Sequence, residues 1–268
     1  MLINRHTRLF ILLCLLASST IVAQPDSSGT AYIPDEKQLN YTLGKTNITI
    51  SISRYGSRND LVLINLHDDE YTSVEAARSV LQQEGGILVK INNNGERRIR
   101  FIYAGKKYMV DPNRIFSQKG IQQTLKRHSR YSKQAAEQVK KFAQRLLSLI
   151  PKEARYVIAL HNNMDGAPLS IHSYLPAGNL SVNARDACHH PRHDPDDFFL
   201  TTSQAVHQKI CEAGYNSVWQ HSQKAEQDGS LSIHFRNHRR ISYVNCETEH
   251  GRTSVYRDML KQLLAVIE

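Results

Sequence analysis

The chain has 268 residues, enough for one sizeable α/β domain and hardly enough for two. Charged residues make up 22% of it and hydrophobic residues 40%, a globular balance that excludes an intrinsically disordered chain. The net charge of +9 is spread along the chain without a basic motif interleaved with aromatic residues, so we expect no nucleic-acid partner.

The N-terminal residues 1–23 are predicted to be a signal peptide. Arg5 and Arg8 form a positive start, residues 9–17 form an apolar core, and Ala23 offers a small residue for cleavage. Hydroxyl residues interrupt the apolar run, so we expect no stable membrane span in the mature chain. Cleavage lowers the net charge from +9 to +7. The protein is therefore expected to be exported, periplasmic or secreted; an uncleaved anchor is the alternative.

Strand and helix patterns alternate along the rest of the chain. Residues 24–45 are polar and are expected to form a flexible lead-in to a folded domain at 46–268. In chain order we expect an edge strand at 47–53, a strand at 61–66, a helix at 72–84, strands at 87–91, 98–103 and 108–110, a helix at 132–150, a strand at 155–160, a loop at 178–197, a strand at 198–201, a helix at 203–213, strands at 217–220, 231–235 and 241–246, and a helix at 254–267. Strands separated by helices predict a single three-layer α/β/α domain with a mostly parallel mixed sheet.

Three apolar strands end at residues that can bind a metal or move a proton. His67 follows the strand at 61–66, and His161 follows the strand at 155–160. Glu247 follows the strand at 241–246. Ligands of open α/β sheets bind at the carboxyl ends of the strands. The sequence therefore predicts that these side chains meet at one edge of the sheet and form the site.

His67 and Glu70 form a His-x-x-Glu motif at a corner between a strand and a helix. Two ligands three residues apart in a turn can face one cation, and catalytic zinc accepts an imidazole nitrogen together with a carboxylate oxygen. The motif is short and common. The alternative is a cluster of acids in the first turn of a helix, where negative charge is favoured.

A second motif lies at Asp111-Pro112-Asn113-Arg114. The amide of Asn113 and the guanidinium of Arg114 are suited to holding a carboxylate or a developing oxyanion. The alternative is an Asp-Pro turn with an incidental surface arginine.

These motifs follow one another in an order found in a known family. The sequence resembles the aspartoacylase and succinylglutamate desuccinylase family, a branch of the zinc carboxypeptidase superfamily. The resemblance covers roughly residues 60–255 in short islands, of which the second and third look specific. The islands are His67-x-x-Glu70, Asp111-x-Asn113-Arg114-Ile115-Phe116, Leu160-His161-Asn162-Asn163 and an acid within Asn245-Cys246-Glu247-Thr248-Glu249-His250-Gly251.

The resemblance implies a zinc-carboxypeptidase-like catalytic domain that binds one zinc ion. His67 and Glu70 would hold the ion with a third histidine, and a glutamate of the last strand would be the general base. Arg114 would stabilise the oxyanion and, with Asn113, would hold the substrate. Asn162 is also expected among the substrate-binding residues.

Two of these roles each have two candidate residues that lie close together in the sequence. The third ligand is expected to be His161, with His172 as the alternative, because Ser170-Ile171-His172-Ser173-Tyr174 is similar to the third-ligand segment of digestive carboxypeptidases. The base is expected to be Glu247, which ends the apolar strand directly. Glu249 is the alternative base, because it lies two residues before Gly251, as the corresponding acid does in the family.

The expected function is that of an exported zinc-dependent hydrolase cutting an amide bond next to a carboxylate, as a carboxypeptidase, deacylase or cell-wall peptide amidase. The partner would be a small peptide, an acylated amino acid or a cell-wall stem peptide. A carboxylate- or peptide-binding protein on the same fold, without turnover, is the alternative. A serine hydrolase is disfavoured because no Gly-x-Ser-x-Gly motif occurs.

The histidine-rich segment 188–194 is a weaker candidate for a metal site, and we interpret it as a surface loop or a lid. The mature chain keeps Cys188, Cys211 and Cys246, which permit one disulfide in an oxidising compartment. The sequence does not select the pair.

Overall fold

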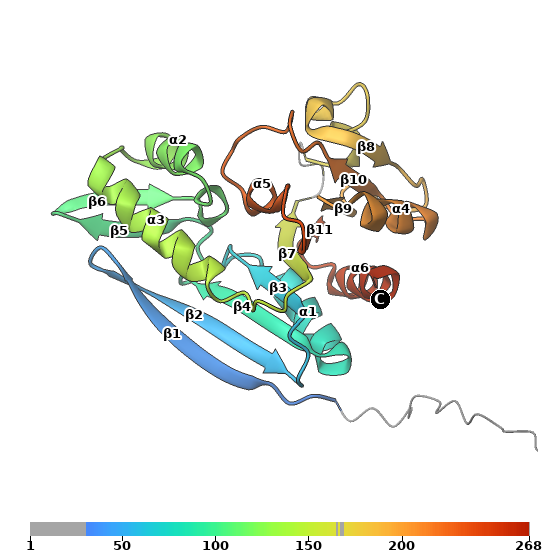
Figure 1. The fold of residues 1–268 in the computed structure, drawn as a ribbon, viewed down its shortest axis with the longest axis horizontal. Helices are drawn as coiled ribbons and strands as arrows, with labels where there is room; N and C mark the ends of the chain where they lie inside the picture. Colours follow the sequence, from blue (N-terminus) through green and yellow to red (C-terminus); the bar gives the residue numbers. More distant parts are fainter. Residues whose placement is uncertain (1–30, 165, 167–168, 268) are drawn as a thin grey trace, which may run out of the picture. The chain divides into compact units, whose positions relative to one another are not determined.

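The computed structural model describes residues 31–164, 166 and 169–267 (Figure 1). The signal peptide predicted over 1–23 lies outside these residues. The helices are α1 (Tyr71–Glu84), α2 (Gln118–His128), α3 (Lys133–Leu147), α4 (Gln204–Glu212), α5 (Leu231–Phe235) and α6 (Thr253–Ile267), with 3-10 turns η1 (Pro112–Arg114), η2 (Ile171–Ser173) and η3 (Ser181–Asn183). In the described part of the chain, no helix has both the length and the apolar character needed to cross a membrane.

One large sheet organises the domain. Its strands lie in the order β1-β2-β4-β3-β7-β11-β9-β10-β8. Strands β1, β3, β4, β7, β8 and β11 run in one direction, and β2, β9 and β10 run in the other. A separate hairpin is formed by β5 and β6. The bounds are β1 (Asp35–Leu43), β2 (Thr46–Tyr55), β3 (Leu61–Asn65), β4 (Gly86–Asn92), β5 (Ile99–Tyr103), β6 (Lys106–Val110), β7 (Tyr156–Asn163), β8 (Ala184–Cys188), β9 (Phe198–Thr201), β10 (Ser217–Gln220) and β11 (Ser242–Glu249).

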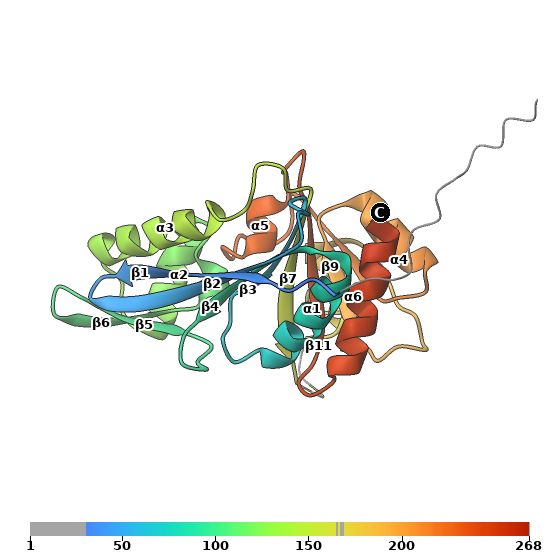
Figure 2. The ribbon, with the colours of Figure 1, turned by 90° about the horizontal axis from the view of Figure 1, so that it is seen from below.

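Helices cover both faces of this sheet, as Figure 2 shows from below. In β3, Val62 and Ile64 project into one core, which also contains buried residues of α2, α3 and α5. Leu61 and Leu63 project from the other face into a second core, with α1, α4 and α6. Side chains of a strand alternate between faces, so a strand buried on both faces is apolar throughout. The prediction of a single three-layer α/β/α domain with a mostly parallel mixed sheet is confirmed.

The boundaries of the clearest predicted helix follow from its end signals. In α3, the side chain of Ser132 accepts a hydrogen bond from the backbone N–H of Ala135 at 3.0 Å, which is the N-cap geometry. Val139 and Phe142 on the same face are fully buried. The sequence pattern extended this helix to residue 150, three residues beyond its observed end at Leu147.

The lead-in predicted over 24–45 is wrong from Asp35 onwards, because that stretch forms β1. Polar residues are tolerated there since β1 lies at the edge of the sheet and its side chains are mostly exposed. As a consequence, β2 is not the edge strand predicted at 47–53; it pairs with β1 and with β4. A polar strand at a sheet edge does not show the apolar alternation of a half-buried strand.

Two other segments also differ from the sequence prediction. The alternation of residues 231–235 predicts a strand, but they form α5, because a run of five residues fits one helical turn equally well. The backbone N–H of Leu231 donates to Asn113 Oδ1 at 3.0 Å and so starts this turn through a tertiary contact. The loop predicted over 178–197 contains η3 and β8, and β8 pairs with β10 at the far edge. Helix α2 was not predicted.

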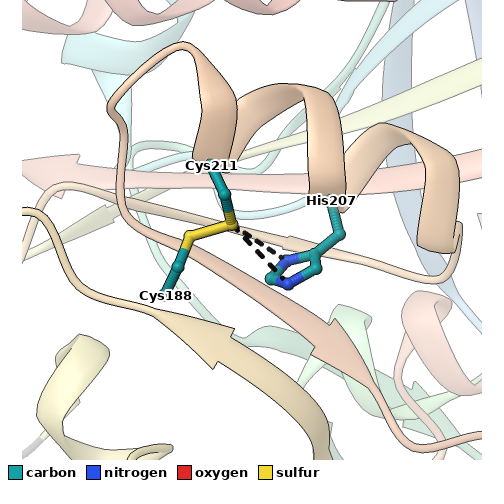
Figure 3. Close-up of side chains that lie close together, drawn as sticks. All are labelled: Cys188, His207 and Cys211. Carbon is teal, nitrogen blue, oxygen red and sulfur yellow. Dashed lines mark hydrogen bonds between the residues drawn. A yellow bond between two sulfur atoms is a disulfide. The ribbon is translucent and has the colours of Figure 1, made fainter.

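A disulfide joins β8 to α4. Cys188 and Cys211 are bonded, and the ring of His207 packs beside the Cys211 sulfur, with a nitrogen 3.6 Å away (Figure 3). His207 is buried, and Ser217 Oγ lies 2.9 Å from its Nδ1. Among the described residues, Cys246 is free and buried. The structure thus selects the pair that the sequence left open.

Replacing both Cys188 and Cys211 by alanine is expected to lower the free energy of unfolding by about 3 kcal/mol, because the bond closes a loop and restricts the unfolded chain. The two residues are 23 positions apart in sequence. Urea denaturation of the unaltered protein and the double variant, followed by circular dichroism, measures the difference in the free energy of unfolding. Equal midpoints for the two proteins would contradict the prediction.

Candidate metal centre and active-site cavity

The three chemical groups predicted at strand ends lie on one face of the sheet. β3, β7 and β11 are parallel neighbours, so their carboxyl ends meet at the same edge. Glu247 in β11 is the register partner of His161 in β7. His67 follows β3 by two residues. The long-range part of the site therefore comes directly from the sheet topology.

His67, Glu70 and His161 form a compact group that can hold a metal ion. Each offers one ligand atom, and these atoms all lie within 4.8 Å of one another. His67 Nδ1 is 3.1 Å from Glu70 Oε1, and His161 Nδ1 is 3.0 Å from Glu70 Oε2. The residues are 1%, 0% and 4% exposed, respectively. Two imidazoles and a carboxylate in this arrangement match the three-ligand set of catalytic zinc.

The far nitrogens of both imidazoles are also held. His67 Nε2 lies 2.9 Å from Asp111 Oδ1, and His161 Nε2 lies 3.2 Å from Asn113 Nδ2. Both partners belong to the short turn that contains η1, which places them over the ends of the strands. A metal-bound imidazole donates its other ring N–H, so Asp111, which accepts, can set the orientation of the His67 ring, whereas Asn113 presents a donor to His161. The sequence motif contains Asp111 but predicts no role for it; its position two residues before Asn113 was the available signal.

The charges of this group depend strongly on one another. Burial alone would raise the pKa of Glu70, but the positive charges of His161 and His67 hold it well below its usual value. Burial lowers the pKa of His67, but Glu70 and Asp111 outweigh it and raise the pKa to about 9. Asp111 beside His67 has a lowered pKa, although burial opposes the shift. The geometry thus combines fixed negative charge with two nitrogen donors, as a cation site requires.

Arg97 is a member of the site that the sequence did not reveal. Its Nη1 lies 2.5 Å from Glu70 Oε1, and its side chain remains 43% exposed. It stands between β4 and β5, in a segment without a recognisable motif. The only available signal was its place among several basic residues, from which no single arginine could be selected.

A cavity of about 280 Å³ opens beside the metal group. It contains Glu247, which is 6% exposed and accepts a hydrogen bond from Asn245 Nδ2 at 2.9 Å. Burial raises the pKa of Glu247, and the nearby carboxylate of Glu70 adds to the shift, although His161 opposes it. The cavity is lined by His67, Arg97, Asn113, Arg114, His161, Leu169, Tyr174, Leu180, Asn183, Leu200, Gln220, Ala225, Glu226, Asp228, Ser230, Ser232, Ile233, Tyr243, Asn245 and Glu247.

Two of the residues predicted for substrate binding lie on this cavity. The Nε of Arg114 is 3.5 Å from Asp228 Oδ2, and its Nη1 donates to the carbonyl of Asn113 at 2.8 Å. Asn113 lines the same wall, but both ends of its amide are engaged, with His161 and with Leu231. Asn113 is therefore placed to orient the metal group and α5, and Arg114 is the freer of the two.

Three other predicted residues do not line the cavity. Asn162 points to the opposite face, where it accepts from the backbone N–H of Ser73 and donates to the carbonyl of Thr248. Glu249 lies 3.3 Å from Arg252, within a cluster that also includes Asp194. His172, the alternative ligand, is exposed. Alternation along a strand explains Asn162, since it directly follows the inward-facing His161.

His172 packs on another histidine and not on the residues of the candidate metal centre. Its ring packs against that of His189 with centroids 4.8 Å apart. It is not part of the groups of described residues that could hold a metal, which include His161. The histidine-rich segment likewise contributes no histidine to those groups; His190 and His193 pack on each other, and His193 stacks on Tyr215.

No protein-family model matches the chain, and neither does any curated protein. Solved structures are similar to it at low identity. A candidate metallopeptidase from Shewanella denitrificans shares 12% identity over 85% of this chain and 83% of its own, with a TM-score of 0.40. An aspartoacylase family protein from Mesorhizobium loti shares 12% identity over 87% of this chain and 66% of its own, with a TM-score of 0.44. A candidate carboxypeptidase A from Shewanella denitrificans shares 9% identity over 87% and 64%, with a TM-score of 0.45.

One of these proteins bears the name of the aspartoacylase family, which the sequence motifs resemble. Identities of 9% to 12% carry no information on individual side chains of the cavity. The chemistry of the site rests on the positions of its own residues.

Proposed function

We propose that this chain is an exported zinc-dependent hydrolase that cleaves an amide bond adjacent to a carboxylate. One observation carries the proposal: a buried His67–Glu70–His161 group opens onto a cavity that also contains Glu247. An ion-binding group, a buried carboxylate and an arginine around one cavity are the components that hydrolysis of an amide needs. The predicted His172 and Glu249 are not needed for it.

His67, Glu70 and His161 would hold one zinc ion, which when bound supplies Lewis-acid activation of water and of the carbonyl. Glu247 then takes a proton from the attacking water and passes it to the leaving nitrogen. A base with a raised pKa is well matched to both transfers. The oxygen of water bonds to the carbonyl carbon and the C–N bond breaks, giving a carboxylic acid and an amine.

The two arginines of the cavity have different positions and hence different proposed tasks. Arg97 contacts Glu70 and lines the cavity, so we assign to it, in place of Arg114, the stabilisation of negative charge on the carbonyl oxygen. Arg114 lies beside Asp228 on the same cavity and is suited to receive the carboxylate of the substrate. Asn113 keeps His161 in place and so supports the site indirectly.

The proposed substrates are small peptides, acylated amino acids or cell-wall stem peptides. A cavity of about 280 Å³ suits a group of this size. Export is supported by the signal-peptide pattern of residues 1–23 and by the disulfide between Cys188 and Cys211, because disulfides persist in oxidising compartments.

The metal content and activity of the purified mature protein test this proposal. We expect about one zinc per chain, and release of free amino acids from short peptides or N-acyl amino acids in a ninhydrin or mass-spectrometric assay. Removal of zinc with a chelator should abolish release, and added zinc should restore it. Tight binding of a carboxylate ligand without zinc and without release would instead indicate a binding protein on the same fold.

Zinc binding at pH 7 is expected to displace about one proton from the protein, because an imidazole must be neutral to bind a metal. The pKa of His67 is raised to about 9, so after chelation its ring is protonated at pH 7. The apparent affinity should therefore rise about tenfold per pH unit up to about pH 9. Calorimetric titration in buffers of different ionisation enthalpy counts the protons released per zinc ion bound. Release of nearly no protons would contradict the prediction.

The same shift has a consequence for stability after chelation. A pKa that is higher in the folded chain than in the unfolded chain means that the protonated ring stabilises the fold. The contribution of His67 to the free energy of unfolding is complete below its usual pKa of 6.5. It is lost as the pH rises through the folded-state pKa of about 9. The melting temperature of the chelated protein should accordingly fall between pH 7 and pH 10.

A further inference from the structure

One group of potential metal ligands shares no member with the candidate metal centre. It consists of Cys188, His207 and Cys211, here called the cysteine–histidine group. Each residue offers one ligand atom, and these atoms all lie within 4.8 Å of one another. Figure 3 shows the imidazole beside the two sulfur atoms, which are bonded to each other in this structure. A disulfide needs no imidazole beside it, so the position of His207 suggests a further role.

The spacing of the group along the chain is one that binds metal ions. His207 and Cys211 are four residues apart on α4. Side chains at this spacing lie on one face of a helix, one turn apart, and a helix that supplies two ligands to a zinc ion uses the same spacing. Cys188 ends the strand β8 and faces this helix through the disulfide. A helix and a strand thus present three ligand atoms to one point.

The distances within the group fit a tetrahedral ion. The two nitrogens of the His207 ring lie 3.7 and 3.6 Å from the Cys211 sulfur. With bonds of about 2.0 Å to nitrogen and about 2.3 Å to sulfur, these two ligand atoms are about 3.6 Å apart on a tetrahedral zinc ion, and two sulfurs are about 3.8 Å apart. The Cα atoms of Cys188 and Cys211 are 6.1 Å apart. Once the bond between the sulfurs is broken, rotation of the two side chains is therefore enough to reach this separation.

The ring of His207 is held as a metal-binding imidazole is held. Its Nδ1 lies 2.9 Å from Ser217 Oγ, and both residues are buried. With the proton on Nδ1 donated to this oxygen, Nε2 keeps a lone pair for an ion. Nε2 lies 3.4 Å from Asp186 Oδ2, which adds negative charge where a cation would bind. Burial lowers the pKa of His207, and a neutral ring is the form that binds a metal.

The two cysteines of the group differ from Cys246 in their access to solvent. Cys188 and Cys211 are partly exposed, so that a reductant and an ion can reach them. Cys246 is completely buried in the core that contains α1, α4 and α6. Burial also raises the pKa of the Cys246 thiol, which disfavours the thiolate that a metal requires. Cys246 therefore serves as an internal control.

We propose that the reduced form of this protein binds a zinc ion at the cysteine–histidine group, with two thiolates and the imidazole of His207 as ligands. A dithiol reductant breaks the S–S bond, becomes a disulfide itself and leaves thiols at Cys188 and Cys211. Binding of Zn²⁺ releases the two thiol protons. Exchange with a disulfide oxidant restores the bond between the cysteines and releases the ion. The site is independent of the proposed function, because it uses none of the same residues.

Titration of the oxidised and the reduced protein with Co²⁺ tests the proposal. The reductant is a phosphine, since dithiols bind metal ions themselves. We expect the reduced protein to bind about one more ion per chain, with a thiolate-to-cobalt charge-transfer band that the oxidised protein lacks. The candidate metal centre has no sulfur ligand, so the band does not depend on it. Equal metal content of the two forms, or an additional ion without the band, would overturn the proposal.

Cys211→Ala should abolish both the additional ion and the band, because it removes one thiolate from the group. Cys246→Ala is the matched control: it also removes one cysteine, but one outside the group, and should keep the ion and the band. Circular dichroism establishes that both variants fold. A band that persists in Cys211→Ala, or disappears in Cys246→Ala, would contradict the assignment of the ligands.

His207→Ala separates the proposed site from binding by two thiols alone. The variant is purified in the oxidised form, in which the disulfide supports the fold, and is then reduced. Its affinity for zinc at the additional site should fall more than about tenfold, measured by competition with a chromogenic chelator. His234→Ala is the control, because His234 is exposed on α5, outside the group, and its loss should leave the affinity unchanged. Unchanged affinity in His207→Ala would show that the imidazole is no ligand and would refute the site.

Discussion

Replacement of Glu247 by glutamine is expected to lower kcat/KM by a factor of about 10² to 10⁴, the usual contribution of a positioned base. The amide keeps the size of the side chain but cannot take a proton from water. Glu247 does not belong to the group of candidate metal ligands, so the variant should retain its zinc. Hydrolysis rates and metal content measured on the same preparation separate the two effects.

Glu249→Gln is the matched control for this experiment. Glu249 lies two residues farther along β11, against Arg252, and does not line the cavity. Its replacement should change kcat/KM far less than that of Glu247. The opposite ranking of the two variants would show that the assignment of the base is wrong.

Replacement of His161 by alanine is expected to abolish stoichiometric zinc binding, and with it the activity. Loss of a partner that only orients a ligand already costs about 10- to 100-fold in metal affinity, and loss of a ligand should cost more. His161 contacts Glu70 through Nδ1, and its loss leaves only His67 and Glu70 of the three-residue group. Competition with a chromogenic chelator measures the affinity.

His172→Ala tests the rival ligand directly. His172 is exposed and packs on His189, away from Glu70, so zinc affinity should stay unchanged. Circular dichroism of both variants establishes that they fold. Loss of zinc in His172→Ala but not in His161→Ala would overturn the proposed metal group.

The order of strands and helices in the central part of the fold was predictable because it depends on local patterns. The fully buried strand β3 and the amphipathic helix α3 carry strong, repeated signals over their own length. β1 was missed because an edge strand is largely exposed and needs no apolar face. α5 was assigned to the wrong class because five residues are too few to distinguish a period of 2 from one of 3.6.

Some residues of the candidate site were predictable from local chain geometry or strand direction, and others depend on contacts between distant segments. His67 and Glu70 are three residues apart, so their proximity is a matter of local chain geometry. His161 and Glu247 could be added because parallel strands bring their carboxyl ends together. Arg97 and the pairing of Glu249 with Arg252 could not be predicted, since each depends on where a loop or a helix end lies above the sheet.

From its sequence alone, this protein is an α/β domain in which buried strands end in two imidazoles and a carboxylate, because burial and strand direction are encoded locally. Only the tertiary structure decided between His161 and His172 and between Glu247 and Glu249 as cavity residues. In both pairs the two residues have similar chemistry and lie close in sequence. What separates them is the environment, a cavity on one face of the sheet or an exposed or ion-paired surface, and that depends on contacts between distant segments.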